Sequence, residues 1–166
     1  FRANGKPRHA DSRKAAADAG IGLGADPGLS NVICRACADR LDEIDSINLY
    51  WTATTLGPPS PVLEPPYSPS TILAEYANPS QQFLNGALQE MPPRSGEETW
   101  DLPEPFGRTT FMFSQHSEPL TVPFAAGIAD KGIKEFTWRL ALPHEQHQAW
   151  LNLVKVGFGD FETPVT

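Results

Sequence analysis

An asparagine-glycine pair in the middle of the chain constrains the fold more than any other feature of this sequence. Asn85 and Gly86 lie between two short segments, 80–84 and 87–92. Asn-Gly favours the positive φ angles of a type I′ turn, which joins neighbouring antiparallel strands. Residues 80–92 are therefore predicted to form a β-hairpin, and the fold must contain a sheet with antiparallel pairs.

The rest of the chain alternates between helix and strand signals. Helices are predicted over 8–19, 28–41, 68–77 and from Pro143 onward, and strands over 21–23, 44–56, 98–102, 108–114, 120–124 and 135–142. Helix 28–41 is expected to bury an apolar face made of Val32, Ile33, Ala36, Cys37 and Leu41. This order predicts an α+β fold with a mixed, largely antiparallel sheet and helices mainly on one face.

Composition excludes several classes of function. The 166 residues carry a formal net charge of −7 and no basic patch of the kind that binds nucleic acid. No apolar run reaches the length of a membrane span. The two cysteines are too few for a disulfide framework, so a reducing cytoplasm is expected.

Residues 24–31 (Gly-Ala-Asp-Pro-Gly-Leu-Ser-Asn) are predicted to be a turn that enters a helix. Its two glycines permit positive φ, and Pro27 has the φ that a helix start needs. Asp26 or Ser30 is expected to cap the free N–H groups at that start. Turns of this kind place backbone donors beside a ligand.

The glycine run 20–24, with Asp42 about twenty residues later, superficially matches a dinucleotide fingerprint. A predicted helix precedes these glycines instead of a buried strand, and the third glycine of the fingerprint is misplaced. The sequence therefore predicts no phosphate cradle within this chain.

Two further pairs have the spacing of metal ligands or redox groups. Cys34 and Cys37 lack a second cysteine pair and do not follow a strand, so they are interpreted as small core residues. His144 and His147 lack an obvious acidic or cysteine partner and are interpreted as exposed polar residues. No metal site is predicted.

The polar triplet His116-Ser117-Glu118 interrupts an extended apolar segment, and two interpretations remain open. It is either an edge-strand bulge or a polar cluster at one end of the sheet, where a zwitterionic substrate binds. In the second case the imidazole of His116 exchanges protons near neutral pH. Arg108 is then expected to hold a substrate carboxylate through two hydrogen bonds.

Several short motifs resemble the saccharopine dehydrogenase family from residue 14 to the end of the chain. They are Gly24 to Asn31, Leu41-Asp42-Glu43, Tyr67-Ser68-Pro69, Ile72-Leu73, Glu75-Tyr76, Asn85-Gly86, Pro92-Pro93, Pro103-Glu104-Pro105-Phe106-Gly107 and His116-Ser117-Glu118-Pro119-Leu120. Each is short, and their order and spacing carry the resemblance.

Members of that family are two-domain NAD(P) enzymes that transfer hydride at a C–N bond, such as saccharopine, lysine or carboxynorspermidine dehydrogenases. A Rossmann domain holds the cofactor, and a second domain, similar to the catalytic domain of glyceraldehyde-3-phosphate dehydrogenase, supplies substrate contacts and a dimer interface. The resemblance implies that residues 1–23 are the end of a Rossmann domain. It also implies that residues 24–166 form the substrate-binding and dimerisation domain, truncated at its C-terminus.

The resemblance also suggests a site. Asp26, Pro27 and Gly28 are expected near the nicotinamide of NAD or NADP in the intact protein, and the substrate pocket is expected to contain Tyr67, Ser68, Arg108, His116 and Glu118. No residue is assigned as the catalytic acid. The expected substrate resembles an amino acid, and the chain alone is expected to bind no cofactor and to be inactive. The alternative is a dimerisation or small-molecule-binding module without chemistry.

Overall fold

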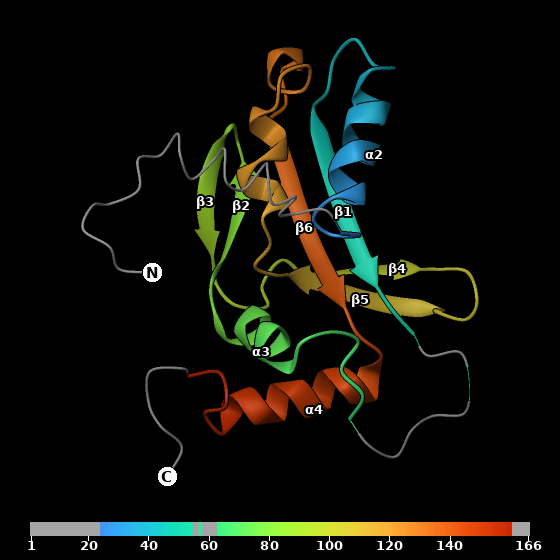
Figure 1. Cartoon of the computed structure of the whole chain (residues 1–166), viewed down its shortest axis with the longest axis vertical. Coiled ribbons are helices and arrows are strands. Elements are labelled where there is room, and N and C mark those ends of the chain that lie inside the picture. The colour runs from blue at the N-terminus through green and yellow to red at the C-terminus, as the bar shows by residue number, and fades with distance from the viewer. Residues whose placement is uncertain (1–23, 55–56, 58–62, 161–166) are drawn as a thin grey trace, which may run out of the picture.

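The computed structural model describes residues 24–54, 57 and 63–160. The predicted helix 8–19 and strand 21–23 lie outside these residues. The helices are α2 (Leu29–Ala38), α3 (Pro69–Ala77) and α4 (His144–Lys155), and the strands are β1 (Ser46–Thr52), β2 (Ser80–Leu84), β3 (Ala87–Met91), β4 (Glu98–Asp101), β5 (Arg108–Phe113) and β6 (Glu135–Ala141). Figure 1 shows these elements along the chain.

The strand β6 is the centre of a six-stranded sheet. One of its edges pairs with β1 in parallel along the whole strand. Its other edge is shared, because β2 pairs with it at Phe136 and β5 pairs with it at Arg139 and Leu140, both antiparallel. β3 extends the sheet beyond β2, and β4 extends it beyond β5. The predicted mixed, largely antiparallel sheet is confirmed.

A side chain fills the place where β6 changes partners. The backbone N–H of Trp138 donates to Gln82 Oε1 at 2.8 Å, and Gln82 Nε2 donates to the carbonyl of Ser114 at 3.3 Å. Gln82 is fully buried. Its amide therefore links β2, β6 and the end of β5 where the regular ladder is interrupted.

The predicted hairpin is confirmed. β2 and β3 pair over their full length, from Ser80 opposite Met91 to Leu84 opposite Ala87. At the turn, Asn85 has φ 53° and Gly86 has φ 78°. Positive φ at both central residues is the signature of a type I′ turn.

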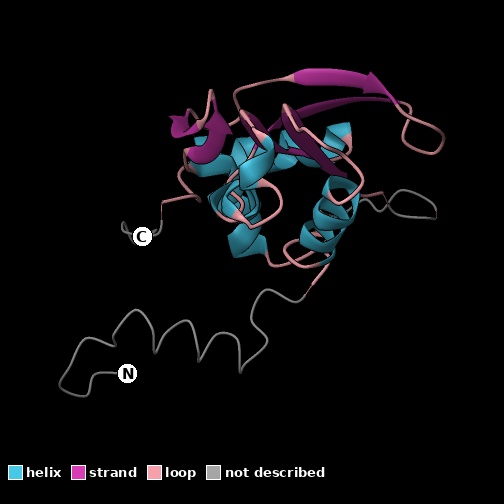
Figure 2. Cartoon of the chain, turned by 90° about the horizontal axis from the view of Figure 1, so that it is seen from above, coloured by secondary structure: helices cyan, strands magenta, loops and turns pink. Residues whose placement is uncertain are grey.

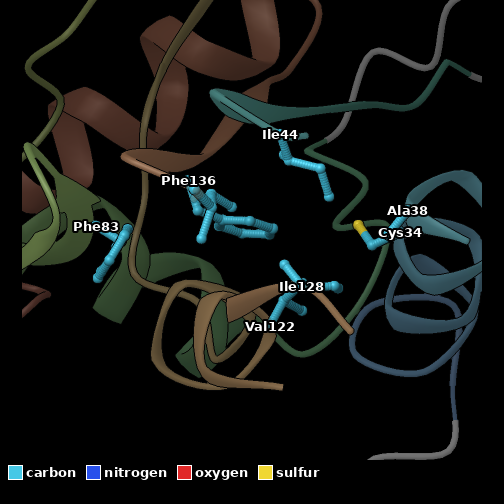
Figure 3. Packing of buried hydrophobic residues seen from close by; sticks show 8 residues of the cluster. Cys34, Ala38, Ile44, Phe83, Val122, Ile128 and Phe136 are labelled. Carbon is cyan, nitrogen blue, oxygen red and sulfur yellow. The ribbon is translucent and has the colours of Figure 1, made fainter. Parts of the chain in front are cut away.

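The helices lie on one face of the sheet, as Figure 2 shows with strands above and helices below. Two apolar clusters form the core on that face. Around Phe136, the first cluster joins Cys34 and Ala38 of α2 to Val122 and Ile128 (Figure 3). The second lies under α3 and α4 and contains Ile72, Tyr76, Met112, Trp138, Leu140, Leu142 and Trp150. The α+β prediction with helices mainly on one face is confirmed.

The predicted buried face of the first helix is wrong. α2 buries Ser30, Cys34 and Ala38, at i, i+4 and i+8, whereas Val32 is 64% exposed and Ile33 is 50% exposed. Ala36, Cys37 and Leu41, also expected inside, are exposed. The small residues let the helix backbone lie close to the segment around Val122 and Ile128. Of the two cysteines, only Cys34 is a core residue.

The segment expected to be extended over 120–124 is also different. It forms two short 3₁₀ turns, η1 (Glu118–Leu120) and η2 (Val122–Phe124), and a third, η3 (Ala129–Lys131), follows. Pro119 and Pro123 stand near the starts of the first two turns. Proline fixes φ near −65° and has no N–H to donate to a ladder, so it favours such a turn over a strand.

Helix capping differs from the prediction in detail. α2 has Gly28 at its N-cap, and the side chain of Asn31 accepts a hydrogen bond from the Gly28 N–H at 3.0 Å. Neither Asp26 nor Ser30 is the cap. α3 begins with Pro69 at its first position, as predicted, but Ser68 makes no capping bond and its hydroxyl lies 2.8 Å from Ser70 Oγ.

Candidate active site

A cavity of about 280 Å³ lies on the helical face of the sheet. Its lining comes from the turn before α2, from strands β1 and β6, from α3 and from the segments around 67 and 116. The lining residues are Ala25, Asp26, Trp51, Tyr67, Thr71, Glu75, His116 and Trp138. Five separate stretches of sequence, with 67–75 counted as one, thus converge on one pocket.

A buried carboxylate holds the imidazole of His116. Glu118 is fully buried, accepts a hydrogen bond from Ser30 Oγ at 2.8 Å, and contacts Nδ1 of His116 through its other oxygen. The His116 ring also stacks on Trp138, with centroids 3.9 Å apart and planes 3° apart. Ring position is fixed from two directions, and Nε2 is the nitrogen that Glu118 does not engage.

The environment of Glu118 favours its charged form. Burial raises the pKa of this carboxyl, but the hydrogen bond and charge of His116, together with the Ser30 hydroxyl, outweigh burial and lower the net pKa. Glu118 therefore presents a negative charge to Nδ1 of His116 at the cavity.

A second carboxyl, Glu75, lies across the cavity and is only 5% exposed. The hydroxyl of Tyr67 donates a hydrogen bond to it. Burial raises the pKa of Glu75, and the Tyr67 hydrogen bond and the His116 charge oppose that rise only in part. Burial and the neighbouring Glu75 raise the pKa of Tyr67 well above its ordinary value, so Tyr67 stays a hydrogen-bond donor.

The walls of the cavity are aromatic. Trp51 and Tyr67 meet edge to face with centroids 5.7 Å apart, and Trp138 adds a third ring. Among the described lining residues, two carry carboxyls, Asp26 and Glu75, and none is a lysine or arginine. Aromatic faces and carboxylates together attract a cation, such as an ammonium group.

The structure brings together three of the residues singled out from the sequence, Asp26, Tyr67 and His116, and it places Glu118 directly behind His116. The triplet 116–118 follows the end of β5 and runs into η1, so the edge-strand bulge is not what forms there. Sequence reasoning missed Glu75 as a site residue. The signal that could have identified it is a charged residue three positions after Ile72, on the side of α3 that is buried.

Other expected residues lie elsewhere. The Ser68 side chain is exposed at the start of α3, and Pro27 and Gly28 are not part of the cavity lining. Arg108 was expected beside His116, but it lines a different cavity, and its side chain is 75% exposed and 3.6 Å from Asp101. The pocket that contains His116 therefore holds no cation for a substrate carboxylate among its described residues.

Backbone N–H groups of the turn before α2 are engaged in hydrogen bonds within the turn and the start of the helix. The N–H of Gly24 donates to Pro27 O at 2.8 Å, and the N–H of Leu29 donates to Gly24 O at 2.9 Å. The Gly28 N–H is taken by Asn31. These groups are not free to hold a pyrophosphate, so the turn fits a pocket wall and does not fit a phosphate cradle.

Gly28 is required for close packing within the turn itself. A Cβ at this position would lie 2.3 Å from Gly24 O and 2.5 Å from Gly24 N. The absent side chain thus allows two segments of the turn to touch.

Within the described ranges, no group of three or more potential ligands is arranged to hold a metal ion. None of the helices seen there is both long and apolar enough to cross a membrane. A comparison with models of known protein families and a search of curated proteins find no match to this chain.

Proposed function

We propose that this chain is the substrate-binding part of a saccharopine dehydrogenase-like, NAD(P)-dependent oxidoreductase that acts on a C–N bond of an amino-acid or polyamine derivative. The observation that carries the proposal is the convergence of His116, backed by Glu118, with Glu75 and Asp26 on one aromatic cavity. Oxidation or reduction at a C–N bond requires proton exchange at the nitrogen, and this cavity offers a group suited to it.

The roles of the side chains follow from their chemistry. An amine enters as an ammonium ion, which the carboxylates of Asp26 and Glu75 and the faces of Trp51 and Trp138 attract. His116 then takes or returns the nitrogen proton while Glu118 offsets the charge that develops on the ring. When bound, a nicotinamide cofactor supplies or accepts the hydride at the neighbouring carbon. The residues described here do not include a cradle for its phosphates.

The alternative function is a binding module without chemistry. The turn before α2, with its donors engaged internally, favours that alternative, because it gives the cofactor no obvious hold. The two functions differ in one respect that can be measured, namely turnover that depends on NAD(P)H.

The test is steady-state kinetics on the intact protein, with NADH or NADPH and a panel of imines formed from amines and 2-oxo acids. His116→Gln should lower kcat by about 10²–10⁴-fold, the usual contribution of a positioned acid–base group. Glu90→Gln, on the exposed strand β3, should leave kcat unchanged. Absence of NAD(P)H-dependent turnover across the panel, with amines still bound, would establish the binding module instead.

The proposal includes a homodimer formed through the open face of the sheet. Tyr50 and Trp100 are 36% and 51% exposed and meet edge to face with centroids 5.8 Å apart. Tyr50 alternates along β1 with Leu49 and Trp51, which pack under the helices, so it lies on the opposite face. A second copy would cover this apolar patch.

Light scattering should give a dimer mass, and Trp100→Glu should shift the mass toward the monomer. A monomeric wild-type mass over a wide concentration range would contradict the dimer.

A cytoplasmic location completes the proposal, since Cys34 and Cys37 are both free thiols. Cell fractionation checks the location.

A further inference from the structure

Two sequence features that the His116 cavity does not use meet at a second cavity. Arg108, at the start of β5, and the pair His144 and His147, in the first turns of α4, line a space of about 200 Å³. The end of β1 and the two residues after it form another part of the wall. Glu97 and four threonines, Thr52, Thr54, Thr109 and Thr110, also line it.

The chemistry of this lining is opposite to that of the first cavity. Three basic side chains face one carboxylate, Glu97, among the described residues, and four threonines add hydroxyl groups. The guanidinium of Arg108 has only a weak competing partner, because Asp101 is 3.6 Å away and both side chains are at least 75% exposed. Arg108 is therefore available to a ligand.

Tyr76 holds the ring of His147 in place at this cavity. Its Nδ1 lies 2.9 Å from the hydroxyl of Tyr76, and the two rings have centroids 5.5 Å apart. This contact leaves Nε2 for another partner. Burial lowers the pKa of His147, the nearby His144 and Arg94 lower it further, and Glu97 opposes them. A bound anion would supply the negative charge that these basic groups lack.

We propose that this second cavity binds a small anion, a carboxylate or phosphate group, between Arg108 and the two histidines. Arg108 forms paired hydrogen bonds with the oxygens of the anion, and threonine hydroxyls donate to the remaining oxygens. The site is distinct from the His116 cavity, and it does not depend on the oxidoreductase proposal.

The experiment titrates the chain with inorganic phosphate, and separately with acetate, while NMR follows the histidine ring protons from pH 5 to 8 at constant ionic strength. Saturable phosphate binding should raise the pKa of His147. Preference for phosphate over acetate identifies the anion as a phosphate group, and the reverse preference identifies a carboxylate.

Arg108→Gln should weaken anion binding by about tenfold or more, as expected when a charge-assisted hydrogen bond is lost. Arg108→Lys should recover part of the affinity, since it restores the charge without the planar fork. Arg40→Gln, which changes an exposed arginine just after α2, is the matched control and should have no effect. No saturable shift at His147, or equal losses in Arg108→Gln and Arg40→Gln, would overturn the proposal.

Discussion

Gly28→Ala should destabilise the folded chain by about 2 kcal/mol or more, the cost of backbone strain combined with a steric overlap. Gly28 has φ 138°, and a Cβ there would lie 2.3 Å from Gly24 O. The atoms that this Cβ would strike belong to the backbone of Gly24, so no flexible side chain can move away to relieve the overlap. The measurement is urea unfolding of the variant beside the wild-type chain.

A matched control separates strain from overlap. Gly132 also has positive φ, at 84°, but nothing lies within 4 Å of a Cβ built there. Gly132→Ala should therefore cost less than Gly28→Ala. Equal losses in the two variants would show that contact with Gly24 is not what Gly28 provides. Gly28→Val, with a larger side chain, should destabilise the fold at least as much as Gly28→Ala.

Glu118→Gln should lower the free energy of unfolding by about 2–3 kcal/mol at pH 7. The carboxylate is fully buried and is bonded to Ser30 and His116, so an amide leaves mismatched donors and removes the charge that His116 faces. The change keeps the size of the side chain, so the loss reports on electrostatics and hydrogen bonding rather than on a cavity.

The same variant should change how stability depends on pH. The pKa of Glu118 is lowered in the folded chain from the ordinary value of 4.5. A lowered pKa adds stability that is present above pH 4.5 and is lost as pH falls through the folded-state value. Wild-type stability should therefore fall below pH 4.5, and the fall should be shallower in Glu118→Gln. Glu90→Gln, on an exposed strand, is the control, and an unchanged slope in Glu118→Gln would contradict the assignment.

Local signals predicted much of the fold. Asn85-Gly86 defined the hairpin because a type I′ turn depends on the two residues themselves. Pro69 marked the start of α3 for the same local reason. The orientation of α2 could not be predicted in this way, because large apolar residues normally face inward. Here the packing partner around Val122 and Ile128 lies so close that Cys34 and Ala38 occupy the interface.

The candidate site was only partly predictable. Asp26, Tyr67 and His116 were singled out separately, but their meeting depends on the parallel pairing of β1 with β6, between residues 89 positions apart. Sequence gives no local signal for such a pairing. The separation of Arg108 from His116 has a local origin instead, because Arg108 begins β5 and His116 follows the other end of that extended strand.

The change of partners along β6 has a consequence for the floor of the His116 cavity. Trp138 lies between the point where β2 leaves the central strand and the point where β5 joins it, so the sheet is forked beneath the stacked imidazole. At the fork the backbone is tied by the amide of Gln82 instead of by a continuous ladder. The His116 imidazole therefore stacks on a residue at the junction between the β2–β3 and β4–β5 parts of the sheet. A change in the twist between these two parts would move Trp138, and the His116 ring would move with it.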